Sequence, residues 1–161
     1  MTHMLSSPRL GGALLIAALA GCSTNSIIGM ESGEKGVFFK RLSVGCVVGK
    51  AKPTTLSGVE LDPEEVYPGE SVAHIASIER CTKEGTPPPD SIRVVRQIVV
   101  GGQVVATNTE EVAPQIDRNG VWEVRSMINI GKNPPGTYQV RTTLEADGRR
   151  QIEVETFTVL R

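Results

Sequence analysis

The sequence predicts an all-β fold: an antiparallel β-sandwich of about seven or eight strands, preceded by an N-terminal signal helix and a flexible tether. Apolar and polar residues alternate repeatedly after residue 36, which is the spacing of half-buried strands, and no stretch of ten residues there has helical spacing. The 17 glycines and ten prolines fall between the apolar runs, as turns between short strands do. A sandwich or a barrel satisfies this pattern.

An apolar run at residues 10–20 follows the positive charge of Arg9. A membrane-spanning helix needs roughly twenty apolar residues, so this run is too short to span a bilayer. A positive start, a short apolar centre and small residues at its end are typical of a secretory signal peptide. We therefore expect residues 1–21 to be a signal segment that is removed.

Leu19, Ala20, Gly21 and Cys22 end this run and resemble the lipobox of bacterial lipoproteins. The resemblance implies that Cys22 becomes the mature N-terminus and carries a diacylglycerol, and two or three acyl chains anchor a protein stably. In a diderm bacterium the next residue biases sorting. Ser23 is not the aspartate associated with inner-membrane retention, which favours the periplasmic face of the outer membrane. The alternative is an ordinary secretory signal, or a buried helix, with an accidental cysteine.

Three cysteines in an exported chain leave one thiol unpaired. If Cys22 carries lipid, Cys46 and Cys81 remain as an even pair in an oxidising compartment. A disulfide between them would close a loop of some 35 residues, for which the chain-entropy model gives about 3–4 kcal/mol. Two buried free thiols are the alternative, because sequence alone does not show that their Cβ atoms meet.

Residues 22–36 are mostly small and polar and show no sustained period. We expect them to be a flexible tether of about 20 Å that joins the lipid to a single domain at 37–161. The net charge is −1, and removal of the signal segment, whose one charged residue is Arg9, leaves −2. A nearly neutral domain lacks the basic surface of a nucleic-acid-binding protein, so no nucleic-acid partner is expected.

Two turns between candidate strands have the clearest sequence signals. Gly101 and Gly102 form a two-residue connection that supplies the positive φ of a tight hairpin turn, and Asp147 and Gly148 turn the chain into the last strand. The candidate strands are 38–48, with apolar residues at the even positions, and then 55–61, 71–81, 92–100, 103–112, 122–130, 138–146 and 151–160.

The last candidate strand changes phase. Ile152 and Val154 are at even positions, whereas Phe157 and Val159 are at odd positions. If all four side chains face the core, the strand needs one extra residue between the two pairs. We therefore expect a β-bulge near residues 155–156.

Residues 66–72 (VYPGESV) and 135–140 (PGTYQV) resemble landmarks of immunoglobulin-like and fibronectin type III-like domains. The first resembles the approach to the second strand, and the second resembles the start of the penultimate strand in bacterial Ig-like domains. The resemblance spans about residues 54–160. It implies that Tyr138 forms a corner, its hydroxyl bonding to nearby backbone, and that Gly69 is a turn glycine.

The chain departs from antibody-type domains in two places. Val140 lies where such a domain carries its second cysteine, so a Cys46–Cys81 disulfide would not be the inter-sheet bridge of antibodies. Trp122, which we expect in the core, comes near the fifth or sixth strand instead of the third. A transthyretin-like or other Greek-key sandwich is the rival topology.

Few residues of this chain suggest catalysis. The single histidine after the signal segment, His74, lies within a candidate strand, where a surface or satisfied histidine is the expectation. Zinc-motif spacing is missing from the sequence, and we expect no metal and no cofactor. Asp62 and Pro63 favour one helical turn at 62–65. Glu64 and Glu65 are the basis of an alternative function, a small envelope enzyme or enzyme inhibitor.

The two apolar strands around the Gly101–Gly102 turn indicate binding. Both faces of this hairpin are apolar, whereas a half-buried strand is polar on its outer face. We predict a lipid-anchored binding or scaffold module that holds another envelope protein, with coverage of the hairpin by the molecule's own loops as the alternative. A ligand- or polysaccharide-binding lipoprotein is disfavoured because the chain has only six aromatic residues. The candidate partner-binding residues are Ile98, Val99, Val100, Val104 and Val105.

Overall fold

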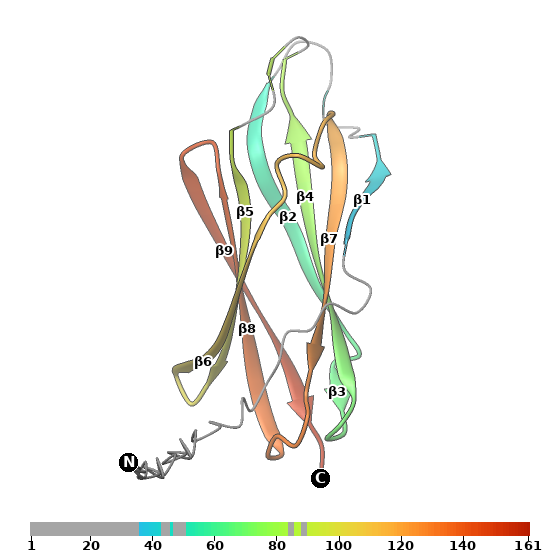
Figure 1. Ribbon diagram of the computed structural model, residues 1–161, viewed down its shortest axis with the longest axis vertical. Helices are drawn as coiled ribbons and strands as arrows, with labels where there is room; N and C mark the ends of the chain where they lie inside the picture. Colours follow the sequence, from blue (N-terminus) through green and yellow to red (C-terminus); the bar gives the residue numbers. More distant parts are fainter. Residues whose placement is uncertain (1–35, 43–45, 47–50, 84–85, 88–89) are drawn as a thin grey trace, which may run out of the picture.

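The computed structural model describes residues 36–42, 46, 51–83, 86–87 and 90–161, which form two packed β-sheets and no helix (Figure 1). The predicted signal helix and most of the predicted tether lie outside these residues. The prediction of an all-β, sandwich-like fold is confirmed. The nine strands of the described part are β1 (Gly36–Arg41), β2 (Lys52–Asp62), β3 (Glu65–Val66), β4 (Ser71–Cys81), β5 (Ile92–Val100), β6 (Gln103–Glu111), β7 (Gly120–Asn129), β8 (Gly136–Ala146) and β9 (Arg149–Val159).

One sheet has the strand order β1-β7-β4-β2 and the other has the order β3-β9-β8-β5-β6. Every pair is antiparallel except β3 with β9, which is parallel, so the prediction of a purely antiparallel sandwich is wrong at this one pair. In Figure 1 the two sheets face one another along the long axis of the molecule, and the hairpin of β5 and β6 lies at one side.

Strand β3 replaces the helical turn predicted at 62–65, and it raises the strand number above the expected seven or eight. The chain leaves the four-stranded sheet at Asp62 and joins the other sheet beside β9. Thr158 N donates to Glu64 O at 2.8 Å, and Leu160 N donates to Val66 O at 2.7 Å. These bonds hold the segment extended, which excludes the helical turn.

Strand β9 has no bulge at 155–156, so that prediction is wrong. Its register with β8 runs without a shift from one end to the other. Phe157 is buried in the core, whereas Ile152 and Val154 are 55% and 50% exposed. Apolar residues therefore change face along a regular strand, and two of them lie on the outer face of the sheet.

Strand β1 ends at Arg41, and residues 43–45 and 47–48 of the predicted strand 38–48 lie outside the described residues. The described part presents the face opposite to the predicted one. Val37 and Phe39 pack against the core, and Phe38 is exposed, so the even-position prediction is wrong there. Phe39 pairs with Trp122 of β7, with the rings 5.1 Å apart and edge to face. Gly120 leaves room for the Phe39 ring, because a Cβ at Gly120 would lie 2.5 Å from it.

The two predicted turns are present. Gly101 and Gly102 both have positive φ, 56° and 82°, and they connect β5 to β6. Asp147 and Gly148 have φ of 52° and 67° and connect β8 to β9. Positive φ at both central residues gives a turn whose twist matches that of the flanking strands.

Candidate functional site

Strand β6 is the outermost strand of the five-stranded sheet, and β5 is its neighbour in the described part of the chain. Residues 103–109 include no charged residue and no proline. Val104 and Val105 are 47% and 44% exposed. Edge strands of soluble proteins usually carry a lysine, a proline or a covering loop that prevents further pairing. We call the backbone side of 103–111 that faces away from β5 the β6 edge.

The hydrogen-bond pattern indicates which backbone groups lie on the β6 edge. Ile92 O accepts from Val112 N at 2.8 Å, just beyond the paired residues of β5 and β6. Bonded and non-bonded pairs alternate along an antiparallel ladder, so the even residues of 106–110 bond to β5. The amide and carbonyl groups of Thr107 and Thr109 consequently point away from the sheet.

By contrast, side chains from the β8–β9 region bond to β2, which is an edge strand of the four-stranded sheet. Thr54 N donates to Asp147 Oδ2 at 2.7 Å, and Leu56 N donates to Gln151 Oε1 at 2.9 Å. Gln151 Nε2 in turn donates to Thr54 O at 3.2 Å. No comparable side-chain bond reaches the β6 edge from the residues that the structure describes. With nine residues, β6 is also longer than the edge strands β1 and β3.

The five candidate residues of the hairpin lie on different faces of the sheet and differ in exposure. Ile98 is buried in the core, and the partly buried Val100 packs against the same core cluster. Val99 pairs with Val104 on the outer face and is buried there, whereas Val104 is exposed. A register shift after Ile98 leaves Val105 as an extra, exposed residue of β6. The structure therefore brings only Val104 and Val105 to the accessible surface.

A fully buried arginine holds β6 from within. Arg96 of β5 donates through Nη1 to Glu110 Oε2 at 3.0 Å and to Asn108 Oδ1 at 3.3 Å, and both acceptors are on β6. Its Nη2 donates to Val124 O at 3.4 Å, and its Nε donates to His74 Nδ1 at 2.9 Å. One side chain thus joins β6 to two strands of the opposite sheet.

His74 is neutral in this arrangement. Its Nδ1 accepts from Arg96, so Nε2 carries the proton and donates to Thr142 Oγ1 at 2.7 Å. Burial and, secondly, the positive charge of Arg96 lower the pKa of His74 to about 3. Burial also lowers the pKa of Arg96, and Glu110 opposes this shift. His74 is a satisfied interior residue that no solvent-borne substrate reaches.

These residues belong to a layer that divides the core. His74 pairs with Ser126 in one sheet, and Arg96 pairs with Thr142 in the other. We call these four residues the polar layer. Apolar clusters of buried side chains lie on either side of it. The alternation pattern does not predict this layer, although each of its members is a polar residue at an inward position of its strand.

The predicted acidic site does not gather into a catalytic arrangement. Asp62, Glu64 and Glu65 are all exposed. A shallow cavity of about 440 Å³ at the β8–β9 turn is lined by other residues, Arg93 and Arg149 among them. In the described part of the chain, no three His, Cys, Asp or Glu side chains come together as metal ligands. The same residues contain no helix long and apolar enough to cross a membrane.

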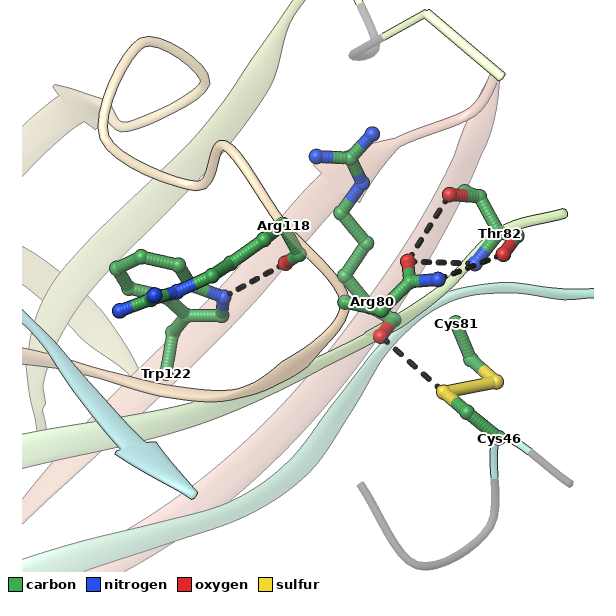
Figure 2. Close-up of a disulfide and its surroundings, with 7 residues drawn as sticks. Cys46, Arg80, Cys81, Thr82, Arg118 and Trp122 are labelled. Atoms are coloured by element: carbon green, nitrogen blue, oxygen red, sulfur yellow. Dashed lines mark hydrogen bonds between the residues drawn. A yellow bond between two sulfur atoms is a disulfide. The ribbon is translucent and has the colours of Figure 1, made fainter. Parts of the chain in front are cut away.

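The predicted disulfide joins Cys46 to Cys81 at the end of β4, with the Cα atoms 5.4 Å apart. Figure 2 shows it beside Arg80, whose carbonyl oxygen lies near Cys46 Sγ. The Arg80 guanidinium is buried and donates to Ile116 O at 2.7 Å. This end of the sandwich is therefore closed by a covalent link and a buried cation.

Three residues expected to be structural occupy defined positions. Trp122 is buried, and its Nε1 donates to Arg118 O at 3.1 Å (Figure 2). Tyr138 is buried, and its hydroxyl donates to Pro134 O at 2.6 Å. Gly69 has a φ of 93° in the turn before β4.

No family model and no curated protein matches the sequence. Among solved structures, an alkylpurine DNA glycosylase of Pseudomonas fluorescens bound to DNA is 16% identical, with a TM-score of 0.49. A CARDB domain of Pyrococcus furiosus in complex with di-metal ions is 17% identical, with a TM-score of 0.42. The matches cover 67% and 70% of this chain, and 30% and 96% of those chains. This chain therefore spans about a third of the glycosylase, and the matches carry no argument about activity.

Proposed function

We propose that this protein is a lipid-anchored binding module of the bacterial cell envelope, without chemistry of its own, that holds an extended segment of another envelope protein along β6. The observation that carries the proposal is the β6 edge: a nine-residue strand, uncharged from 103 to 109, at the end of a sheet. A peptide that adds a strand to such an edge gains main-chain hydrogen bonds, and neighbouring side chains determine its specificity.

The chemistry of the edge defines the kind of segment that fits. Thr107 and Thr109 offer backbone donors and acceptors to an added strand. Val104 and Val105 offer apolar contact at the hairpin end. Glu110 and Glu111 at the other end already pair with Arg96 and with Arg93, respectively. We therefore expect a neutral, β-branched or aliphatic segment, because no uncompensated charge is present to select a charged one.

The polar layer supports a binding role because it prepares the edge in advance. Arg96 fixes Asn108 and Glu110 from the inner side of β6, so the strand is ordered before a partner arrives. Because β6 is already ordered, the partner does not have to supply the conformational entropy cost of ordering this strand when it binds.

The proposed location rests on the N-terminal sequence. Cys22 follows the lipobox-like residues 19–21 and would carry the lipid, and residues 22–36 would tether the domain on the periplasmic side of the outer membrane. The Cys46–Cys81 disulfide is in keeping with an oxidising compartment.

We also assign the sandwich to the Ig-like class. The Tyr138 hydroxyl bonds to Pro134 O four residues earlier, as a corner tyrosine does, and this contact favours that class over the transthyretin-like rival. Gly69 N donates to Gly131 O at 2.7 Å and joins the turn before β4 to the loop after β7.

Crosslinking in the native envelope tests the binding role, with Thr109→Pro compared against Thr109→Val. Proline removes the outward amide hydrogen of residue 109 and leaves the bonds between β5 and β6, whereas valine keeps that amide. We expect the proline variant to lose the crosslinked partner and the valine variant to retain it. Equal recovery of the partner by both folded variants would contradict docking along the β6 edge.

A further inference from the structure

The outer face of the five-stranded sheet, which is the side turned away from the other sheet, carries a row of charges with alternating sign. Arg150 of β9, Glu145 of β8, Arg93 of β5 and Glu111 of β6 lie side by side across four strands. The ion pairs between neighbours measure 3.1 Å, 3.9 Å and 3.6 Å along the row. We call these four residues the charge row.

Next to the charge row, the same face carries five aliphatic residues and four threonines among twelve residues. Ile152 and Val154 are exposed on β9, and Val104 is exposed on β6 at the other side of the face. Neighbouring exposed aliphatic side chains, such as those of Ile152 and Val154 on β9, are typical of an interaction surface. Three rows, each read from β9 to β6, make up this region: Ile152, Thr143, Val95 and Thr109; Val154, Arg141, Gln97 and Thr107; Thr156, Gln139, Val99 and Val104.

We propose that this outer face binds the same face of a second copy of this chain. The two copies are related by a twofold axis that lies between the faces and runs parallel to the strands. Such a rotation keeps each row at its own level and reverses the order of the strands. Stacked β-sheets pack about 10 Å apart with nearly aligned strands, which this arrangement satisfies.

Charge complementarity identifies the second copy as the occupant. A row with the signs + − + − reads − + − + when its order is reversed. Arg150 therefore lies opposite Glu111 of the second copy, and Glu145 lies opposite Arg93 of the second copy. All four facing pairs are of opposite sign, which is the condition for a self-complementary twofold interface.

The remaining rows are also compatible with this arrangement. Ile152 and Val154 face Thr109 and Thr107 of the second copy, so the exposed apolar side chains meet threonine methyl groups. Arg141, which is the one charge in these three rows, faces Gln97 of the second copy, whose amide oxygen can accept a hydrogen bond. No like charges meet.

The area of this outer face determines the expected affinity of the dimer. Four strands about 4.8 Å apart and some 24 Å of strand length give a face of roughly 450 Å² per chain. Specific interfaces usually bury about 800 Å² per partner, so we expect a weak dimer whose population depends on concentration. The backbone groups of the two β6 edges would lie at opposite sides of the dimer and remain free, whereas the Val104 side chain belongs to the face. This inference does not depend on the proposed function.

Two charge variants test the pairing. Full-length chains with two different affinity tags are co-extracted in detergent, and recovery of one tag through the other is measured. In a dimer of Glu145→Arg chains, the new arginine faces Arg93 of the second copy. In a dimer of Arg93→Glu chains, the new glutamate faces Glu145 of the second copy. Like charges therefore face each other in both dimers. We expect each variant to lose self-recovery about tenfold. A mixture of the two variants places opposite charges at all four facing pairs, so we expect recovery to return to the wild-type level.

Two further variants complete the experiment. Ile152→Lys changes an exposed aliphatic residue of the face and is expected to abolish self-recovery, whereas Glu60→Arg, at an exposed position on β2 of the other sheet, is the matched control and is expected to have no effect. Circular dichroism verifies folding of each variant. The proposal is overturned if the face variants self-associate like the wild type, if the mixture does not restore pairing, or if a different protein occupies the face.

Discussion

Arg96 and His74 come from opposite sheets, and Arg96 Nε donates to His74 Nδ1 at 2.9 Å. This bond requires the histidine to be neutral at Nδ1, since a protonated ring would direct a second N–H at the guanidinium. A buried cation and a titratable ring are therefore joined at the centre of the molecule, and the stability of the fold depends on the protonation state of the ring.

The first prediction concerns pH. The pKa of His74 is lowered from 6.5 in the unfolded chain to about 3 in the folded protein. Between these values the unfolded state binds one more proton than the folded state, so stability falls as the pH decreases from 6.5 toward 3. We expect a slope approaching about 1.4 kcal/mol per pH unit. Urea unfolding between pH 7 and pH 5 measures it.

His74→Gln is the matched variant for this measurement, because it removes the titrating group and keeps a polar side chain of similar size. Its stability should be nearly independent of pH between 7 and 5. Glu111 and Glu123 also have pKa values lowered from 4.5, and most of their effect on stability falls below that interval. A wild-type curve that is flat between pH 7 and 5 would show that the ring is not held neutral by the fold.

The second prediction compares two arginines of β5. Arg96→Met leaves Glu110 without its buried cation and His74 without its donor, and breaking a buried pair in this way costs about 3–5 kcal/mol. Arg93→Met removes exposed ion pairs, whose loss costs about 0–1 kcal/mol. Denaturant unfolding of both variants gives the comparison. Equal losses would argue against the structural role of Arg96.

The third prediction compares two glycines. Gly120 has a φ of 149°, and a Cβ there would lie 2.5 Å from the Phe39 ring and 2.7 Å from Arg41 O. We expect Gly120→Ala to cost about 1–3 kcal/mol and to displace β1 from β7. At Gly58 a Cβ meets nothing within 4 Å, so Gly58→Ala is the control. Thermal unfolding and the near-ultraviolet signal of Trp122 report the outcome; a Gly120→Ala protein as stable as the control would contradict the packing.

The fourth prediction concerns the anchor. Cys22→Ser removes the side chain that would carry the proposed thioether-linked lipid in the lipobox-like sequence, and two or three acyl chains would be sufficient for stable attachment. We expect the variant to leave the membrane fraction and to lack the mass of the acyl chains. Cys46→Ser, which leaves Cys22 in place, should stay membrane-bound. Membrane attachment of the Cys22→Ser protein would argue for a different anchor.

Alternation of apolar and polar residues predicts most strands of the sandwich. Strands β4 and β5 begin and end at the predicted residues, and the two turns with positive φ are present. Alternation gave the wrong result where a surface position is apolar: Ile152 and Val154 resemble core residues in the sequence and lie on the outer face. Pattern alone does not distinguish an exposed aliphatic face from a β-bulge.

The candidate site could be predicted only in part. The two apolar faces of residues 98–106 predict that this hairpin is a candidate site, but which of its residues are accessible depends on a register shift after Ile98. The contact between Arg96 and His74 joins strands of different sheets, and local patterns contain no information about which strands meet. A polar residue at the inward position of several strands was the available signal for the polar layer.

The polar layer also restricts how the strands can align. A slip of β4 by two residues would keep its apolar face inward but would place Val72 or Ala76 at the level of Arg96, whose Nε would then lack an acceptor. A purely aliphatic core would tolerate such a slip far better, because one methyl group substitutes for another. The hydrogen bonds of the polar layer can therefore form in only one alignment of the two sheets.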